Sequence, residues 1–385
     1  MDTSRLRRRV VGRLRNGTVA WPLAFLLTGL GLAFGRYGDL RWGNAAPNPD
    51  VTRMFYPIAS RVASGATLYG PGLADNKPPG WQLANVAVAV AGEYTFGMLL
   101  LVGVANGATA ALLWYWLDDA GAPGVAVASG VLFLLALPLL GGNTINSRPI
   151  MVAFVLLGLV ASRPAVRGLA VAAAALVNAY AAAFVPVLLW AVWREGAAAD
   201  GAGTAADGAG ATADGADADA GAGDQSPIRD AFAYLFAGAT LGVGTFAAVG
   251  AIWGVEATSA ALHWSYGVPL LPGVETSAVH PDATSPGSYL AGTWLITQPG
   301  RWLMYTGTVL AQLFPLVPLA WLGWIHRDRL EAAAPDAALL ALSLAAALFP
   351  LLFRSYEQYW LVPLPFVAVL AATGVVALSD GRPSE

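Results

Sequence analysis

The chain has 385 residues, of which 57% are hydrophobic and only 12% are charged, and its mean hydropathy is +0.58. Because soluble domains carry about 25% charged residues, this composition predicts a helical membrane protein. A net charge of -3 without any long basic stripe argues against a nucleic-acid partner. The absence of cysteine excludes disulfides and thiolate metal sites, and three histidines disfavour a histidine-built metal site.

Apolar segments long enough to cross a bilayer recur along the chain and predict about ten transmembrane helices. The expected spans cover residues 18–35, 95–117, 124–140, 149–161, 166–177, 180–193, 231–255, 302–325, 336–353 and 359–378. Two points stay open, since 80–92 is short for a span and 166–193 is also compatible with one long tilted helix. The positive-inside rule favours a non-spanning 80–92, because Arg163 and Arg167 are then cytoplasmic.

The N-terminus resembles the basic leader of a signal peptide, but no small-residue cleavage site follows its apolar stretch. We therefore expect a retained first span, preceded on the cytoplasmic side by Arg5, Arg7, Arg8, Arg9, Arg13 and Arg15. The expected protein is a multi-pass protein of the cell membrane with both termini in the cytoplasm. Residues 36–92 then form a long first external loop, and residues 256–301 form a second one.

The chain divides into three predicted parts. An N-terminal membrane module (1–193) is followed by an acidic cytoplasmic linker (194–229) and a C-terminal membrane module (230–385). Between residues 196 and 227 the linker consists almost entirely of Ala, Gly, Asp and Thr. Such a segment lacks the apolar mass that offsets the entropy cost of ordering, so we expect it to be disordered.

Ionisable residues are concentrated in the predicted external loops and are almost absent from the central turns of the predicted spans. A transporter would be expected to place some ionisable residues or broken helices near the bilayer midplane. The distribution therefore predicts chemistry on the external membrane face.

The first external loop begins with a predicted amphipathic helix over residues 48–65. Asn48 is the expected N-cap, and Asp50 lies exposed in the first turn. The apolar stripe consists of Val51, Phe55, Ile58 and Val62. This helix is expected on the bilayer surface or against the spans. In the simplest interpretation Asp50 only complements the helix dipole, a contribution of about 0.3–1 kcal/mol.

Lys77 is the only lysine of the chain and stands in the segment "NKPPG". Two prolines follow it, so its backbone is expected to be stiff. A lysine ammonium is a compact charge that can bind a phosphate. The simpler interpretation is a solvated loop lysine before a helix.

Taken together, these motifs resemble the GT-C superfamily of polyprenyl-phosphate-sugar-dependent glycosyltransferases. The branch of dolichyl-phosphate-mannose mannosyltransferases and aminoarabinose transferases is the most similar, because a first-loop acidic residue and a Lys-Pro-Pro motif recur in it. The resemblance runs from Asn48 to Gly92, with weaker echoes in "NTINSRP" (143–149) and "FRSYEQYWLVPLPFVAVLAA" (353–372). The chain departs from the family in having Asp-Val where many relatives have Asp-Glu, and in lacking a lysine in "VNAYAAAF" (177–184).

The resemblance implies an all-α membrane fold of GT-C type and an inverting transfer of a sugar, with mannose favoured. The donor would be a polyprenyl or dolichyl phosphate sugar. The acceptor would be a glycan, lipid or protein on the external face, in surface-glycan or N-glycan assembly. Asp50 is the candidate general base, and Lys77 the candidate clamp of the donor phosphate. Further candidates for phosphate contacts are Arg148, Arg301 and Arg354, with Arg354 favoured. Supporting roles are expected for Tyr56, Tyr69, Asn76, Tyr356, Glu357 and Tyr359.

Several alternatives stay open. No obligatory metal is expected, because a basic side chain can stabilise a lipid monophosphate leaving group, although Asp50, Asp75 and Glu357 together could attract a cation. Arg354 is equally compatible with an interfacial anchor. The second external loop suits either an acceptor-binding lid or an ordinary ordered loop. The rival functions are a flippase or transporter of lipid-linked sugars and a non-catalytic subunit of a glycosylation complex.

Overall fold

The computed structural model describes residues 19–73, 75–209, 226–267, 294–327, 337–353 and 355–379. Within these residues the chain forms helices and no β-strand, which confirms the predicted all-α class. The helices before the linker are α2 (Ala20–Arg41), η1 (Val51–Phe55), α3 (Tyr56–Ala63), α4 (Pro79–Ala91), α5 (Tyr94–Asp119), α6 (Pro123–Ala136), η2 (Leu137–Leu140), α7 (Ser147–Val160), α8 (Pro164–Val177), η3 (Ala179–Phe184) and α9 (Val185–Ala209). Those after it are α10 (Pro227–Trp253), α11 (Val255–Leu262), η4 (His263–Gly267), α13 (Trp294–Thr297), α14 (Pro299–Gln312), α15 (Leu316–Ile325), α17 (Ala337–Phe353), η5 (Glu357–Tyr359) and α18 (Leu364–Ser379).

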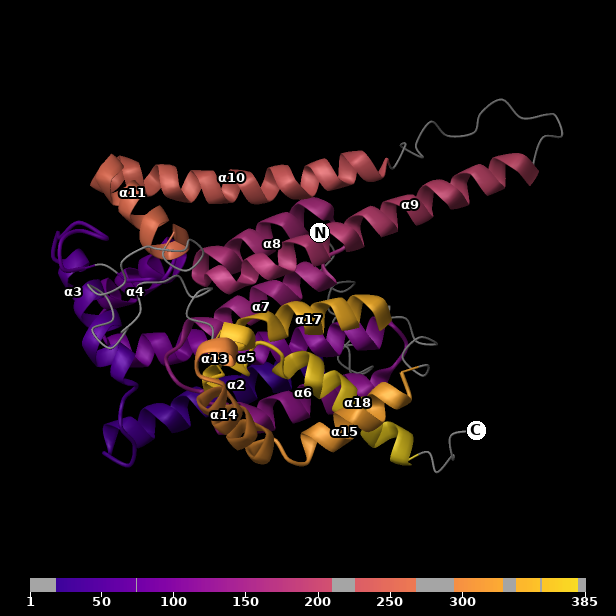
Figure 1. Cartoon of the computed structure of the whole chain (residues 1–385), viewed down its shortest axis with the longest axis horizontal. Coiled ribbons are helices and arrows are strands. Elements are labelled where there is room, and N and C mark those ends of the chain that lie inside the picture. Colours follow the sequence, from indigo (N-terminus) through magenta and orange to yellow (C-terminus); the bar gives the residue numbers. More distant parts are fainter. Residues whose placement is uncertain are drawn as a thin grey trace, which may run out of the picture.

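Most of the longer helices run roughly along one axis, which is horizontal in Figure 1. The helices α3, α4 and α11 gather at one end of this bundle, on the left in Figure 1. The far end of α9 and the last turns of α18 lie toward the opposite end. Most of the residues singled out in the sequence precede or follow bundle helices at the α3–α4 end.

Four described helices are long and apolar enough to cross a bilayer, over Tyr94–Asp119, Pro123–Leu140, Ala179–Ala198 and Pro227–Trp253. A fifth span results if α14 and α15 are counted together, although they are bent by 84°. Four further apolar helices are shorter, namely α7, α8, α17 and α18. These helices support a membrane protein, while the topology of ten spans stays a prediction.

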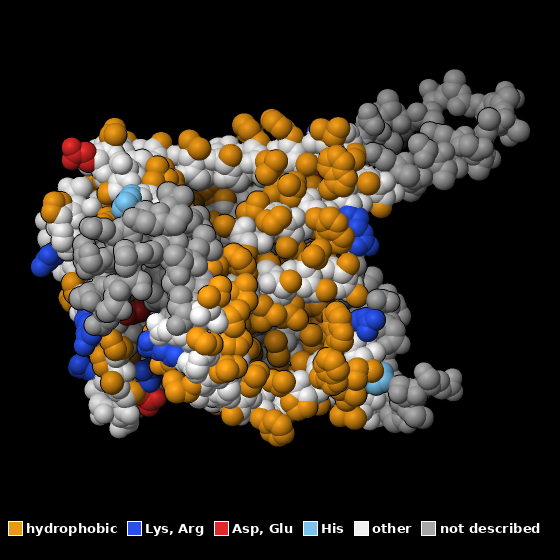
Figure 2. Space-filling view, viewed as in Figure 1, with side chains coloured by type: hydrophobic (Ala, Val, Ile, Leu, Met, Phe, Trp, Pro, Cys, Tyr) orange, Lys and Arg blue, Asp and Glu red, His pale blue; other side chains and the backbone are white. Residues whose placement is uncertain are grey.

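The surface agrees with this interpretation. Figure 2 shows hydrophobic side chains across the middle of the visible face, with Lys and Arg side chains toward its two ends. Only 6% of the most apolar segment of α10 is buried inside the protein, and its residues Phe232, Phe236 and Val243 are each more than 60% exposed. Such a surface is stable against lipid rather than water.

Glycines allow close packing between several of these helices. A Cβ atom at Gly29 of α2 would lie 2.4 Å from the carbonyl oxygen of Gly103 in α5. A Cβ atom at Gly374 of α18 would lie 2.2 Å from the carbonyl oxygen of Leu319 in α15. Because lipid provides no hydrophobic drive between helices, close backbone contacts of this kind stabilise membrane bundles.

One sequence prediction about helix continuity is wrong. The expected single span over 302–325 is broken into α14 and α15 at residues 313–315, where Pro315 cannot continue the backbone hydrogen bonds. The expected separation of 166–177 from 180–193 is confirmed over the alternative of one long helix, because Asn178 is extended (φ -154°, ψ 123°) between α8 and η3.

The structure extends a helix into the linker that is predicted to be disordered, and it forms a short helix over 80–92. α9 continues to Ala209 instead of ending near Trp193, consistent with the high helix propensity of alanine, and residues 210–225 lie outside the described part.

The 13-residue helix α4 has a length of about 20 Å, less than the hydrocarbon thickness. Unlike α7 and α8, α4 is also not among the shorter apolar helices of the described chain, which supports the non-spanning interpretation of 80–92.

Candidate functional site

The predicted amphipathic helix of the first loop is present as η1 followed by α3. Asn48 caps it as expected, because its Oδ1 atom accepts a hydrogen bond of 3.0 Å from the backbone N–H of Asp50. All four residues of the predicted stripe are buried: Val51, Phe55, Ile58 and Val62. Asp50 lies in the first turn as predicted, but it is half-buried rather than exposed, because the apolar side of its helix is packed against the protein.

The first turns of this helix are π-helical, with the N–H of Tyr56 donating to the carbonyl of Val51. Pro57 follows immediately and has no N–H to continue an α-helical ladder. We attribute the wide turn to this proline, at which the sequence also suggests a kink. π-helical turns are frequent at functional sites.

The Lys77 turn is held through its backbone. The hydroxyl of Tyr69 donates to the carbonyl oxygen of Lys77 at 2.5 Å, and the hydroxyl of the buried Ser265 donates to the same oxygen at 3.2 Å. The Lys77 ammonium donates to Oδ1 of Asn76 at 3.2 Å and is half-buried. Burial raises the pKa of Tyr69, so this hydroxyl stays a donor at neutral pH. The backbone of Lys77 is thus held by Tyr69 and Ser265, two residues that are far apart in the sequence.

The residues after Lys77 explain the rest of "NKPPG". Pro78 is the N-cap of α4, and Pro79 occupies its first position, where a missing N–H costs nothing. A Cβ atom at Gly80 would lie 2.7 Å from the carbonyl oxygen of Leu176 at the end of α8. The prolines therefore start the helix, and the glycine lets it approach α8.

Asp75 connects Asp50 and Lys77 electrostatically. It is completely buried, and its Oδ2 atom accepts a hydrogen bond of 2.5 Å from the side-chain amide of Gln82, while Oδ1 has no partner among the described residues. Burial raises the pKa of Asp75, the positive charge of Lys77 lowers it, and the negative charge of Asp50 raises it. Both candidate catalytic residues therefore lie close enough to influence this carboxyl.

From the sequence, Asp75 is predicted only as a loop residue and a possible cation ligand, and Gln82 is not predicted as a site residue. A signal was present, because Gln82 and Asn85 are the only polar side chains between Trp81 and Ala91 of α4 and are three residues apart. Residues with this spacing share a helix face. Both are buried, as expected when another polar group lies against that face of α4 and forms hydrogen bonds with them.

Arg148 is buried at the start of α7 and is bound by the protein itself. Its Nη1 atom donates to Oδ1 of Asn146 at 3.2 Å and to Oε1 of Gln358 at 2.9 Å. The guanidinium carbon lies 3.9 Å from the ring centre of Tyr359. The Nε atom has no hydrogen-bond partner within the described ranges. The guanidinium of Arg148, which is predicted to bind the donor phosphate, is thus already engaged with Asn146, Gln358 and Tyr359.

Tyr359 begins a row of aromatic rings at this end of the bundle. Its ring centre lies 6.3 Å from that of Tyr356, and Tyr356 lies 5.2 Å from Tyr305. The exposed Arg301 lies over Tyr305 at 5.9 Å. The row thus joins four predicted site residues: Arg148, Arg301, Tyr356 and Tyr359. Glu357 is exposed, and Arg354 lies outside the described residues.

One hydrogen bond joins the first loop to the segment that carries Arg148. The side-chain amide of Asn48 donates to the carbonyl of Ile145 at 3.4 Å. Asn48 lies two residues before Asp50, and Ile145 lies three residues before Arg148. The two segments that carry predicted site residues therefore meet at one end of the bundle.

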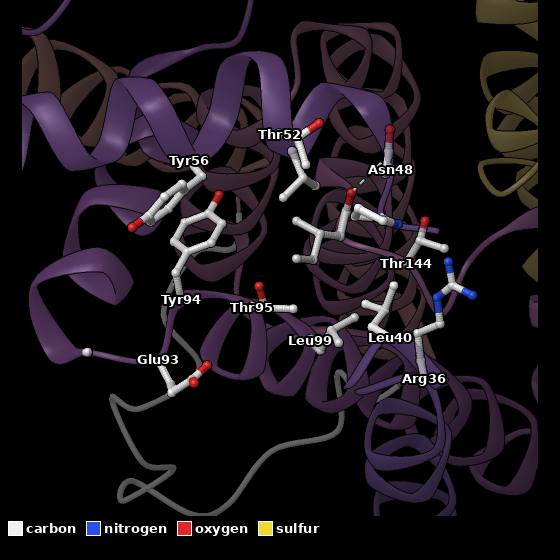
Figure 3. A pocket seen from close by; sticks show the side chains of 14 residues that line it. Arg36, Leu40, Asn48, Thr52, Tyr56, Glu93, Tyr94, Thr95, Leu99 and Thr144 are labelled. Atoms are coloured by element: carbon white, nitrogen blue, oxygen red, sulfur yellow. Dashed lines mark hydrogen bonds between the residues drawn. The ribbon is translucent and has the colours of Figure 1, made fainter. Parts of the chain in front are cut away.

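Next to this hydrogen bond lies a cavity of about 460 Å³, shown in Figure 3. The predicted residue Tyr56 lines it, together with Asn48 and with Arg36, Glu93 and Tyr94, which the sequence analysis did not place in a site. Asp50 and Lys77 are not among the residues that line it.

Within the described ranges no group of three or more His, Asp or Glu side chains could hold a metal ion. Comparisons with protein-family models, with curated proteins and with solved structures give no match to this chain. The function must therefore be argued from the arrangement of its own residues.

Proposed function

We propose that this protein is a membrane glycosyltransferase of GT-C type that transfers a sugar, with mannose favoured, from a polyprenyl or dolichyl phosphate. The acceptor is a glycan, lipid or protein on the external face of the cell membrane. The bundle crosses the membrane about ten times, with both termini in the cytoplasm. The observation that carries the proposal is that Asp75, buried two residues before Lys77, is influenced by the charges of both Lys77 and Asp50.

The donor of such an enzyme has a long apolar tail and one charged phosphate, so it must lie in lipid with its headgroup at the interface. An apolar bundle with Asp50 and Lys77 beside α3 and α4 at one end suits this molecule. Lys77 would bind the phosphate and stabilise the charge that develops as the phosphate leaves. Because the hydrogen bonds to its backbone carbonyl fix the turn, the ammonium is positioned before the donor binds.

Asp50 would accept the proton of the attacking hydroxyl, since an ionised carboxylate at a helix start is a suitable general base. The hydroxyl oxygen forms the new bond to the anomeric carbon as the bond to the phosphate oxygen breaks. A single displacement of this kind inverts the anomeric configuration. The proton passes to Asp50, and the electron pair leaves on the lipid phosphate.

The proposal can be tested by incubating purified protein with a panel of radiolabelled polyprenyl-phosphate sugars and a membrane glycan extract. Transfer from one donor, dependent on Asp50, is expected. Absence of transfer from every donor by folded protein would contradict the proposed activity.

A second candidate function is supported by the bend of 84° between α14 and α15. Broken helices are typical of transporters, in which they form binding sites near the midplane. A flippase of lipid-linked sugars predicts movement of a fluorescent polyprenyl-phosphate lipid across proteoliposomes by the Asp50→Asn variant. The transferase proposal predicts no such movement.

A further inference from the structure

The cavity beside Asn48 has the shape and lining of a small-ligand site. Its volume of about 460 Å³ falls within the range of about 300–1,000 Å³ that is usual for such sites. The apolar part of the lining comes from α2, η1 and α5, through Leu40, Val51 and Leu99. Figure 3 shows hydroxyl and amide groups of Thr52, Asn48 and Thr144 along one side.

The polar groups of the cavity suit a sugar. Threonine and tyrosine hydroxyls and an asparagine amide can each donate and accept, as the hydroxyls of a sugar require. The rings of Tyr56 and Tyr94 lie together at one end, with centres 5.0 Å apart. Tyr94 is buried, whereas Tyr56 is 49% exposed and presents apolar ring surface to the cavity side.

Arg36 gives the cavity a preference for negative charge. In Figure 3 Arg36 and Glu93 stand at opposite ends of the cavity. One guanidinium nitrogen of Arg36, Nη2, donates to the carbonyl of Ala46 at 3.0 Å, which fixes the group. A guanidinium has five N–H donors, and Ala46 takes one of those of Arg36. A fixed guanidinium with further donors is suited to a carboxylate or phosphate.

We infer that this cavity binds the acceptor and that the acceptor sugar carries an anionic group, which Arg36 recognises. The inference rests on the proposed function and adds the class of acceptor to it. Asn48 and Val51 line the cavity on either side of Asp50 in sequence. A sugar bound here therefore lies beside the helical turn that carries the candidate base.

The test is binding by the full-length protein in nanodiscs, measured by saturation-transfer NMR without any donor. The probes are methyl glucuronide, glucose 6-phosphate and neutral methyl glucoside. The wild type should bind one or both anionic sugars about tenfold more tightly than the neutral one. The better of the two anionic probes identifies a carboxylate or a phosphate as the recognised group.

Variants separate recognition from folding. Arg36→Gln should abolish the preference for the anionic sugars, Tyr56→Ala should weaken all three, and Glu93→Gln should keep or increase the preference. Arg61→Gln is the matched control, because Arg61 is exposed on α3 and does not line the cavity. Equal binding of the three probes by the wild type, or an unchanged preference in Arg36→Gln, would overturn the inference.

This assay also separates the inference from the proposed function. If the protein transfers sugar but shows no preference for anionic probes that depends on Arg36, the acceptor site alone is overturned. Binding that depends on Arg36, in a protein that transfers no sugar, would overturn the transferase alone.

Discussion

Arg148 lies over the ring of Tyr359, with its guanidinium carbon 3.9 Å from the ring centre, although Arg148 belongs to α7 and Tyr359 follows α17. Gln358 accepts a hydrogen bond from the same guanidinium. This contact ties the start of α7 to the turn before α18. It therefore serves the stability of this end of the bundle as well as any role toward a ligand.

Arg148→Ala should lower the free energy of unfolding by about 2–4 kcal/mol, because a buried charge-assisted hydrogen bond and a cation–π contact are lost together. Thermal unfolding in detergent measures this as a lower midpoint. Arg301→Ala is the control, since Arg301 is exposed and its removal should change stability by less than about 0.5 kcal/mol. Equal midpoints for both variants would contradict the structural role of Arg148.

Asp75 should make stability depend on pH. Burial raises the pKa of its carboxyl in the folded state, so the folded protein holds this proton more tightly than the unfolded chain does. The stabilisation is complete below the unfolded pKa of about 4 and is lost as the pH rises through the folded pKa.

Asp75→Asn should remove this dependence, because the amide keeps the size of the carboxyl and cannot ionise. Thermal midpoints from pH 4 upward should fall more steeply in the wild type than in Asp75→Asn. Parallel curves for the two proteins would show that Asp75 does not titrate in this way.

Gly80→Ala should damage the Lys77 turn. The new methyl group would lie 2.7 Å from the carbonyl oxygen of Leu176, so α4 must move away from α8, at a cost of about 1–3 kcal/mol. Gly31→Ala is the matched control, since Gly31 is also helical and a Cβ atom there meets nothing within 4 Å. Thermal unfolding of the two variants should differ clearly, and a harmless Gly80→Ala would argue against close packing of these helices.

The two ends of α5 should lie on opposite sides of the membrane. The chain has no cysteine, so single cysteines can be introduced at Glu93 and Asp119, which are both exposed. Glu93→Cys should react with a membrane-impermeant maleimide in intact cells, and Asp119→Cys only after permeabilisation. Labelling of both from the same side would refute the proposed topology.

The sequence predicted the first loop well, because the stripe Val51, Phe55, Ile58 and Val62 follows helical spacing and all four residues are buried. It did not predict the bend between α14 and α15, since hydropathy is continuous across Pro315. Nor did it predict the burial of Asp75 or the contact of Arg148 with Tyr359. Both depend on which helices pack together, and spacing along one chain carries no such information.

The most direct test of the central claim is the turnover of purified Asp50→Asn and Lys77→Ala with a labelled dolichyl-phosphate mannose donor. Each variant should lose about 2–4 kcal/mol of transition-state stabilisation, seen in turnover with normal insertion and folding. Lys77→Arg should retain part of the activity, since it keeps the charge but changes the reach of the group. Arg53→Gln, which removes an exposed cation from the same loop, should behave as the wild type. Wild-type transfer by folded Asp50→Asn and Lys77→Ala would contradict the account.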